Sequence, residues 1–244
     1  MSNPLDAFGS SVALDLMMLA RLHDRELDAS MVAALKSSGF SDGLAFRLES
    51  TKGIEALALT VAAIDSMTDE PEVLDGLAVD FAAIYLTHGL GASPCESVWL
   101  DEDGLVMQQP MFSVRESYAR AGFGVPDWRL RPDDHLVFQL QFVANLLEQK
   151  HVAAFAEAAR FLDDHSLRWL PDFADRVAQR AATPFYAGLA MLTAVYVDEL
   201  RDVLARVLDQ PRPTPEQVEA RTRQVEEVAL PMPNAYVPGS SPSW

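Results

Sequence analysis

The sequence predicts an all-α protein, organised as a single-domain helical bundle with a long ordered loop between helices. Apolar residues recur every three or four positions in five segments, which is the period of a helix with one buried face. The alternating pattern of a half-buried strand is missing, apart from one short extended candidate at residues 98–100. The five helical stripes are Val12, Leu16 and Leu19; Leu74, Leu77, Phe81 and Ile84; Leu136, Leu140, Val143 and Leu147; Val152, Phe155, Ala159 and Leu162; and Phe185, Leu189, Leu192, Tyr196, Leu200 and Val203.

Prolines and glycines stand where helix ends are expected. Pro132, Pro171 and Pro184 each precede an apolar periodic run, and proline suits the first turn of a helix because no backbone N–H is needed there. Gly39 and Gly122 follow helical runs, as C-terminal caps do. We therefore expect helices to begin at the three prolines and to end before the two glycines.

One region lacks a helical period. Residues from about 87 to 110 contain three glycines and two prolines, yet they also contain too many apolar residues for disorder. Irregular loops of this length are uncommon inside compact domains and are usually functional. We predict an ordered loop within a helical domain over residues 1–209, with a hinge at about 124–134. A Pro-rich, loosely ordered tail is expected over residues 210–244.

The composition excludes several classes of partner. The formal net charge of −17 over 244 residues makes nucleic acid a poor ligand, because phosphate binding needs clustered Lys and Arg. Solubility and attraction of a basic partner are two explanations of this acidity that remain open.

No run reaches the roughly 18 apolar residues that would insert in a membrane, and no basic segment of a secretory signal precedes the first apolar run. We therefore expect a cytoplasmic protein. The single Cys95 excludes an internal disulfide and a multi-cysteine zinc site.

No motif for catalysis or cofactor binding is present. The Gly-x-Gly at 89–91 lacks a third glycine, and neither a nucleophile elbow nor a phosphate loop occurs. A triad of Ser93 or Ser97 with His135 and Asp134 can be drawn, but nothing in the sequence brings these residues together. The five histidines show no metal-ligand spacing. We expect no catalytic residue, no metal and no cofactor.

The triplet Asp-Asp-His occurs twice, at residues 133–135 and 163–165. Such a triplet can be an acid/base pair, half of a metal site or a helix cap. The first copy follows Pro132, where a carboxylate in the first turn of a helix can accept free backbone N–H groups. The second copy lies where one helix ends, so capping and solvated charge are favoured for it more strongly.

A series of short blocks resembles the TorD/DmsD family of cytoplasmic chaperones for molybdenum enzymes. The blocks are Ser93-Pro94-Cys95-Glu96-Ser97-Val98-Trp99-Leu100, Gly104-Leu105, Gln109-Pro110, Tyr118, Gly122, Pro132-Asp133-Asp134-His135-Leu136, Phe161-Leu162 with His165, Trp169, Pro171 and Phe173, and Phe185-Tyr186 with Leu189-Ala190. The order and spacing of these blocks over about residues 10–205 carry the resemblance. The resemblance implies an all-helical, non-catalytic protein. Its partners would be the twin-arginine signal peptide and the apo form of a molybdopterin oxidoreductase, which it would hold until cofactor insertion.

The resemblance also implies peptide-binding residues, namely Pro94, Cys95, Pro132, Asp134 and His135. We predict that Ser97 and Trp99 of the same loop belong to this site. Two positions depart from the family pattern. Cys95 stands where an aromatic residue is often found, and Gln139-Leu140-Gln141 stands where Glu-Leu-Glu is often found. We expect Asp133 to serve the helix start, and Asp134 and His135 to face a groove beside the loop. The second triplet is expected to serve structure and solubility.

Two other functions remain open at this point. One is a helical enzyme that uses Asp134 and His135 as acid and base on a small substrate, and the other is an acidic scaffold without peptide specificity. The sequence also leaves open whether the protein is a monomer or a homodimer.

Overall fold

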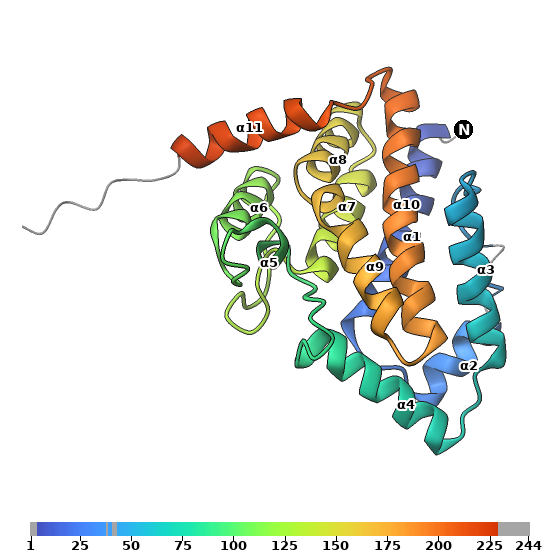
Figure 1. Cartoon of the computed structure of the whole chain (residues 1–244). Coiled ribbons are helices and arrows are strands. Elements are labelled where there is room, and N and C mark those ends of the chain that lie inside the picture. Colours follow the sequence, from blue (N-terminus) through green and yellow to red (C-terminus); the bar gives the residue numbers. More distant parts are fainter. Residues whose placement is uncertain (1–3, 38, 41–42, 229–244) are drawn as a thin grey trace, which may run out of the picture. The chain divides into compact units, whose positions relative to one another are not determined.

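The predicted all-α fold is confirmed by a computed structural model, which describes residues 4–37, 39–40 and 43–228 (Figure 1). Over these ranges the chain forms eleven α-helices, one π-helical turn and one 3-10 turn, and no strand. The elements are α1 (Pro4–Asp24), α2 (Ala29–Ser37), α3 (Thr51–Ser66), α4 (Pro71–Phe81), η1 (Ala82–Leu86), α5 (Ser97–Leu100), α6 (Gln109–Arg120), α7 (Leu136–Glu148), α8 (Val152–Asp164), η2 (Ser166–Arg168), α9 (Leu170–Arg180), α10 (Pro184–Leu208) and α11 (Pro215–Val228). None of the described helices is long and apolar enough to cross a membrane.

The chain divides into two compact units, Met1–Arg212 and Pro213–Trp244. The second unit contains α11, a helix where the sequence predicts a loosely ordered tail. A capping box starts this helix, because Thr214 Oγ1 accepts from Gln217 N at 3.3 Å and Thr214 N donates to Gln217 Oε1 at 2.9 Å. The Thr-Pro-Glu-Gln sequence at residues 214–217 is a local signal for this helix start. Residues 229–244 of the predicted tail lie outside the described residues.

Helix α10 is the central element of the first unit, and it packs against α3, α8 and α9 (Figure 1). Its contact with α3 is close enough to require glycine. A Cβ atom added at Gly188 would lie 2.8 Å from Thr60 Oγ1 and 3.1 Å from the Thr60 backbone nitrogen. A second pairing, of α1 with α7, forms the other large part of the core.

Buried polar side chains fix the ends of these helices. The Asp80 carboxylate accepts from the backbone N–H groups of Ala182 and Thr183 at 3.1 and 2.6 Å, which satisfies free donors at the start of α10. His23 on α1 lies between Tyr85 Oη at 2.5 Å and Thr193 Oγ1 at 2.8 Å. Burial lowers the pKa of His23 to about 3, so the ring is neutral and joins η1, the turn that leads into the loop, to α1 and α10.

Two of the three prolines begin helices as predicted, and the third does not. Pro171 and Pro184 lie in the first turns of α9 and α10. The expectation that Pro132 opens a helix is wrong, because α7 begins at Leu136 and His135 is its N-cap. Gly122 has a φ of 69° directly after α6, as expected of a C-terminal cap.

The loop between η1 and α6 is ordered and largely buried in its middle. Residues 92–97 are all buried. The extended candidate at residues 98–100 is instead part of the one-turn helix α5. His88 and Gly91 have φ values of 53° and 61°, so the chain turns sharply twice before it enters this buried stretch. The loop is therefore a packed element of the first unit.

The close approach of α10 to α3 gives a stability test. Gly188→Ala should lower the free energy of unfolding by about 1–3 kcal/mol, since the added methyl group meets backbone atoms of Thr60 that cannot move aside. Gly76→Ala in α4 is the matched control. It has no atom within 4 Å of the added Cβ, and it should be neutral or stabilise by up to about 1 kcal/mol. Urea unfolding of both variants would measure this, and an equal effect of the two substitutions would contradict the packing argument.

Candidate functional site

The loop meets the segment that precedes α7, for which we keep the name of the predicted hinge, along a short antiparallel bridge between Cys95 and His135. Leu136 N donates to Pro94 O at 2.8 Å, and Glu96 N donates to Asp134 O at 3.2 Å. Segments 40 residues apart in the sequence are thereby held backbone to backbone. The structure brings together five of the seven predicted site residues in this way: Pro94, Cys95, Ser97, Asp134 and His135. We call residues 93–97 and 132–136 the loop–hinge frame.

The Asp134 side chain is fully buried and binds the start of α5. Its Oδ2 atom accepts from Ser97 N at 2.7 Å and from Ser97 Oγ at 2.5 Å, while Oδ1 is buried without a hydrogen-bond partner. Burial raises the pKa of Asp134 to about 6, and the nearby Glu96 charge adds to the rise, against the opposing effect of the Ser97 hydrogen bonds. The expected orientation toward a groove is wrong for this side chain, which is 0% exposed.

His135 is also buried, at 5% exposure, and it too does not face a groove. Its Nδ1 atom accepts from Val137 N at 3.2 Å and so caps α7. Burial, with the positive charge of Arg131 as a further cause, lowers the pKa of His135 well below its usual value. The ring is therefore neutral at physiological pH, with Nδ1 as acceptor and the proton on Nε2.

Asp133 does not serve the helix start as expected. It is 2% exposed, and its Oδ2 atom lies 2.5 Å from Arg115 Nη2 and 2.6 Å from Arg115 Nε. The Arg115 guanidinium carbon also lies over the rings of Phe112 and Trp128, at 5.4 and 4.8 Å from their centres. Tyr118 Oη donates to Asp133 O at 3.0 Å, so Asp133 joins the hinge to α6.

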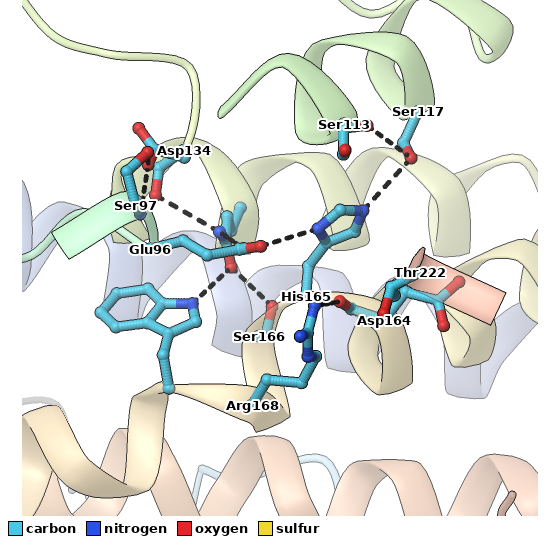
Figure 2. Close-up of polar contacts among 12 residues, drawn as sticks. Glu96, Ser97, Ser113, Ser117, Asp134, Asp164, His165, Ser166, Arg168 and Thr222 are labelled. Carbon is cyan, nitrogen blue, oxygen red and sulfur yellow. Dashed lines mark hydrogen bonds and ion pairs between the residues drawn. The ribbon is translucent and has the colours of Figure 1, made fainter. Parts of the chain in front are cut away.

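A buried polar network lies beneath the frame (Figure 2). Glu96, which is fully buried, accepts from Gln139 Nε2 at 2.6 Å on one oxygen, and its other oxygen lies 2.9 Å from His165 Nδ1. Gln139 Oε1 in turn accepts from Ser166 Oγ at 2.8 Å and from Trp169 Nε1 at 3.4 Å. The network connects the loop to α7, to the end of α8 and to η2. Sequence reasoning did not place Glu96, Gln139 or His165 in one cluster.

The amide of Gln139 is required by this arrangement. It donates to the Glu96 carboxylate and accepts from Ser166 and Trp169, and a glutamate cannot do both when it is ionised. The departure from the family's Glu-Leu-Glu pattern is thus explained at this position, because a second carboxylate would face Glu96.

The second triplet is structural, but it is not separate from the first. The Asp163 carboxylate accepts two hydrogen bonds from the buried Arg201 guanidinium, from Nε at 2.9 Å and from Nη2 at 3.0 Å. His165 of the second triplet contacts Glu96, and Asp134 of the first triplet accepts from Ser97, the next residue in the loop. The two copies are therefore linked through the loop.

The other two predicted site residues, Trp99 and Pro132, lie at the edges of the frame and take no part in the bridge between Cys95 and His135. Trp99 is half-buried, donates from Nε1 to Ser93 O at 2.8 Å, and has the Arg176 guanidinium 4.6 Å from its ring centre. Pro132 lies at the other edge, where its carbonyl accepts from His135 N at 3.1 Å.

Burial, followed by the nearby Asp134, raises the pKa of the Cys95 thiol, so this cysteine stays protonated and unreactive.

A surface cavity of about 450 Å³ opens beside the hinge. We call it the hinge cavity. Its walls come from the end of α1, the hinge and α7, and they include Asp24, Phe123, Asp127, Leu130, Arg131 and Phe138. No sequence signal identified it, because Asp24 and Phe138 are more than one hundred residues apart. Over the part of the chain that the structure describes, no group of three His, Cys, Asp or Glu residues could hold a metal ion.

Comparison with known proteins defines the class. A family model described as "Nitrate reductase delta subunit" matches residues 51–175, slightly more than half of the 244 residues, and this range contains the loop, the hinge and both triplets. "Chaperone protein TorD" of Vibrio cholerae serotype O1 is 28% identical over 204 residues, covering 79% of this chain and 91% of the relative. The protein of the same name from Vibrio vulnificus (strain YJ016) is 27% identical over 208 residues, covering 80% and 95%. The chain belongs to this family, the TorD/DmsD family of molybdoenzyme maturation chaperones.

The raised pKa of Asp134 predicts a pH dependence of stability. The unfolded carboxyl group releases its proton near pH 4, and the folded one does so only near pH 6. The contribution of this group to stability is therefore full below pH 4 and is lost as the pH rises through 6. We expect Asp134→Asn to lose less unfolding free energy than the wild type between pH 4 and 7, by on the order of 2 kcal/mol. Parallel stability curves for the two proteins in urea titrations would rule this out.

The network predicts different effects on stability for substitutions at Gln139 and Gln141. Gln139→Glu should lower the unfolding free energy at pH 7 by about 1–3 kcal/mol, because Glu96 loses a donor and gains a facing carboxylate. Gln141→Glu, on the hinge cavity and only half-buried, should change it by less than about 0.5 kcal/mol. The Gln139→Glu defect should shrink at pH 5, where one carboxyl group can take up a proton. Thermal unfolding of both variants at the two pH values would test this, and a defect that does not depend on pH would point to a steric cause.

Proposed function

We propose that this protein is a chaperone that binds the twin-arginine signal peptide of a molybdopterin-containing oxidoreductase and holds the apoenzyme for cofactor insertion before export. It would act in the cytoplasm. The observation that carries the proposal is the extended match to proteins named as TorD chaperones, which covers about four fifths of the chain and includes the loop and the hinge.

The charge of the protein supports a basic partner. A twin-arginine segment is cationic, and a protein with net charge −17 attracts it over distances of about a Debye length, roughly 8–10 Å at moderate ionic strength. Such steering raises the association rate, whereas apolar contacts keep the peptide bound. The observed acidity therefore fits the class of ligand that the family relationship suggests.

The loop–hinge frame is proposed to position the binding surface without forming it. Asp134, His135 and Cys95 are buried, so a peptide would contact the outer side of the frame. Next to the frame, the Trp99 side chain is partly accessible to solvent, and the hinge cavity opens at the surface. In this proposal Asp134 fixes α5 through Ser97, and His135 fixes the start of α7. Substitutions at either residue would weaken binding by moving the surface.

A catalytic role for Asp134 and His135 is disfavoured by the same contacts. Asp134 Oδ2 is taken up by two hydrogen bonds, and His135 Nδ1 caps a helix. Neither residue lines the hinge cavity. General acid/base chemistry needs a group within hydrogen-bond reach of substrate. We therefore propose a non-catalytic protein.

Peptide selectivity tests the function. Three synthetic signal peptides that differ only in an Arg-Arg, Lys-Lys or Gln-Gln pair should bind in that order of falling affinity, because a guanidinium adds directed hydrogen bonds to charge. Isothermal titration calorimetry at two salt concentrations should show that binding weakens with added salt but is not abolished. Equal affinity for the Arg-Arg and Gln-Gln peptides would reject arginine recognition and favour an acidic scaffold.

A further inference from the structure

The hinge cavity holds a guanidinium group of the protein itself. Arg131 forms an ion pair with the Asp24 carboxylate, and its Nη2 atom donates to Asp24 O at 3.4 Å. The guanidinium carbon lies 5.7 Å from the centre of the Phe138 ring. All three residues line the cavity. The site thus offers a carboxylate, a carbonyl and an aromatic face.

These three partners are the set that suits an arginine side chain. A planar guanidinium donates in a fixed fork to carboxylate oxygens and stacks on an aromatic ring, whereas an ammonium group does neither as well. Asp127 and Gln141 supply further acceptors in the walls of the cavity. Leu130, which is 86% exposed, continues the wall as apolar surface. A peptide with an arginine next to apolar residues would match both parts.

The ion pair of Arg131 with Asp24 is partly open to solvent. Its side chain is 33% exposed and that of Asp24 is 27% exposed, so solvent screens the pair. Asp24 also lies 3.7 Å from Arg25, which shares its charge. An incoming arginine would therefore replace one guanidinium by another and leave the charge of the cavity unchanged.

We propose that the hinge cavity is the subsite for one arginine side chain of the signal peptide, and that Arg131 fills it in the free protein as an internal competitor. This assignment rests on the proposed function. Arg131 directly precedes Pro132, so its backbone position is set by the loop–hinge frame. Removal of the Arg131 guanidinium should strengthen binding of the signal peptide, and removal of the Asp24 carboxylate should weaken it.

Two pairs of variants separate these effects from the change in net charge. Arg131→Gln should bind the Arg-Arg peptide about threefold to fivefold more tightly than the wild type. Arg129→Gln is the control, since Arg129 lies on the same segment but stacks on Trp128 and does not line the cavity. Asp24→Asn should bind about tenfold more weakly, with the exposed Asp69→Asn as its control. Both controls should stay within twofold of wild type in calorimetric titrations.

Equal changes in Arg131→Gln and Arg129→Gln, or in Asp24→Asn and Asp69→Asn, would overturn the subsite while leaving the proposed function intact. A second probe tests the cavity independently of the signal peptide. N-acetyl-arginine amide should shift the ring resonances of Phe138 in NMR spectra of Arg131→Gln, and N-acetyl-lysine amide should not. If the wild type binds the Arg-Arg and Gln-Gln peptides equally but this shift occurs, the proposed function fails, and the hinge cavity remains a site for an arginine side chain without a role in signal-peptide binding. Absence of the shift overturns the subsite.

Discussion

The buried carboxylate of Glu96 is the group on which the loop, and with it the hinge, depends. It is fully buried, and its two oxygens are bonded by Gln139 on α7 and His165 at the end of α8. A buried carboxylate costs several kcal/mol unless its oxygens are satisfied, so the loop can lie here only when both helices present these partners. The conformation of the loop is therefore dictated by how α7 packs on α8 as well as by its own glycines and prolines. The bridge from Cys95 to His135 then transmits that position to the hinge.

The helices could be predicted from the sequence because their signal is local, whereas the hinge could not. A stripe such as Leu136, Leu140, Val143 and Leu147 reports its own buried face, and these residues are buried in α7. Pro132 followed by two aspartates looks like a helix start by the same kind of local rule. In the structure the residues after Pro132 are used by the bridge to residues 94–96, so the helix begins four residues later and is capped by His135. A long-range backbone pairing overrode the local preference.

The candidate site shows the same limit at the level of side chains. The loop block at 93–100 and the block at 132–136 were associated only by resemblance to a family, since nothing in their spacing places them together. The burial of Asp134 has no sequence signature, because an acidic residue after a proline is usually a solvated cap. The linkage of the two Asp-Asp-His triplets depends on Glu96, which carried no signal of its own. The hinge cavity needs Asp24 and Phe138, which only the pairing of α1 with α7 brings together.

Under the proposed function, a buried frame beside an exposed cavity would let the protein release its client without disturbing its own fold. Contacts inside the frame contribute to stability and are not renewed with each binding event. Contacts in the hinge cavity are exposed, and in the free protein they are already made by Arg131. A site that is open for only a fraction of the time has its apparent affinity reduced by that fraction. Under the proposed function, one arginine alone would then bind poorly. Tight binding would require the apolar segment of the peptide as well, so the protein would select the complete signal over other basic chains.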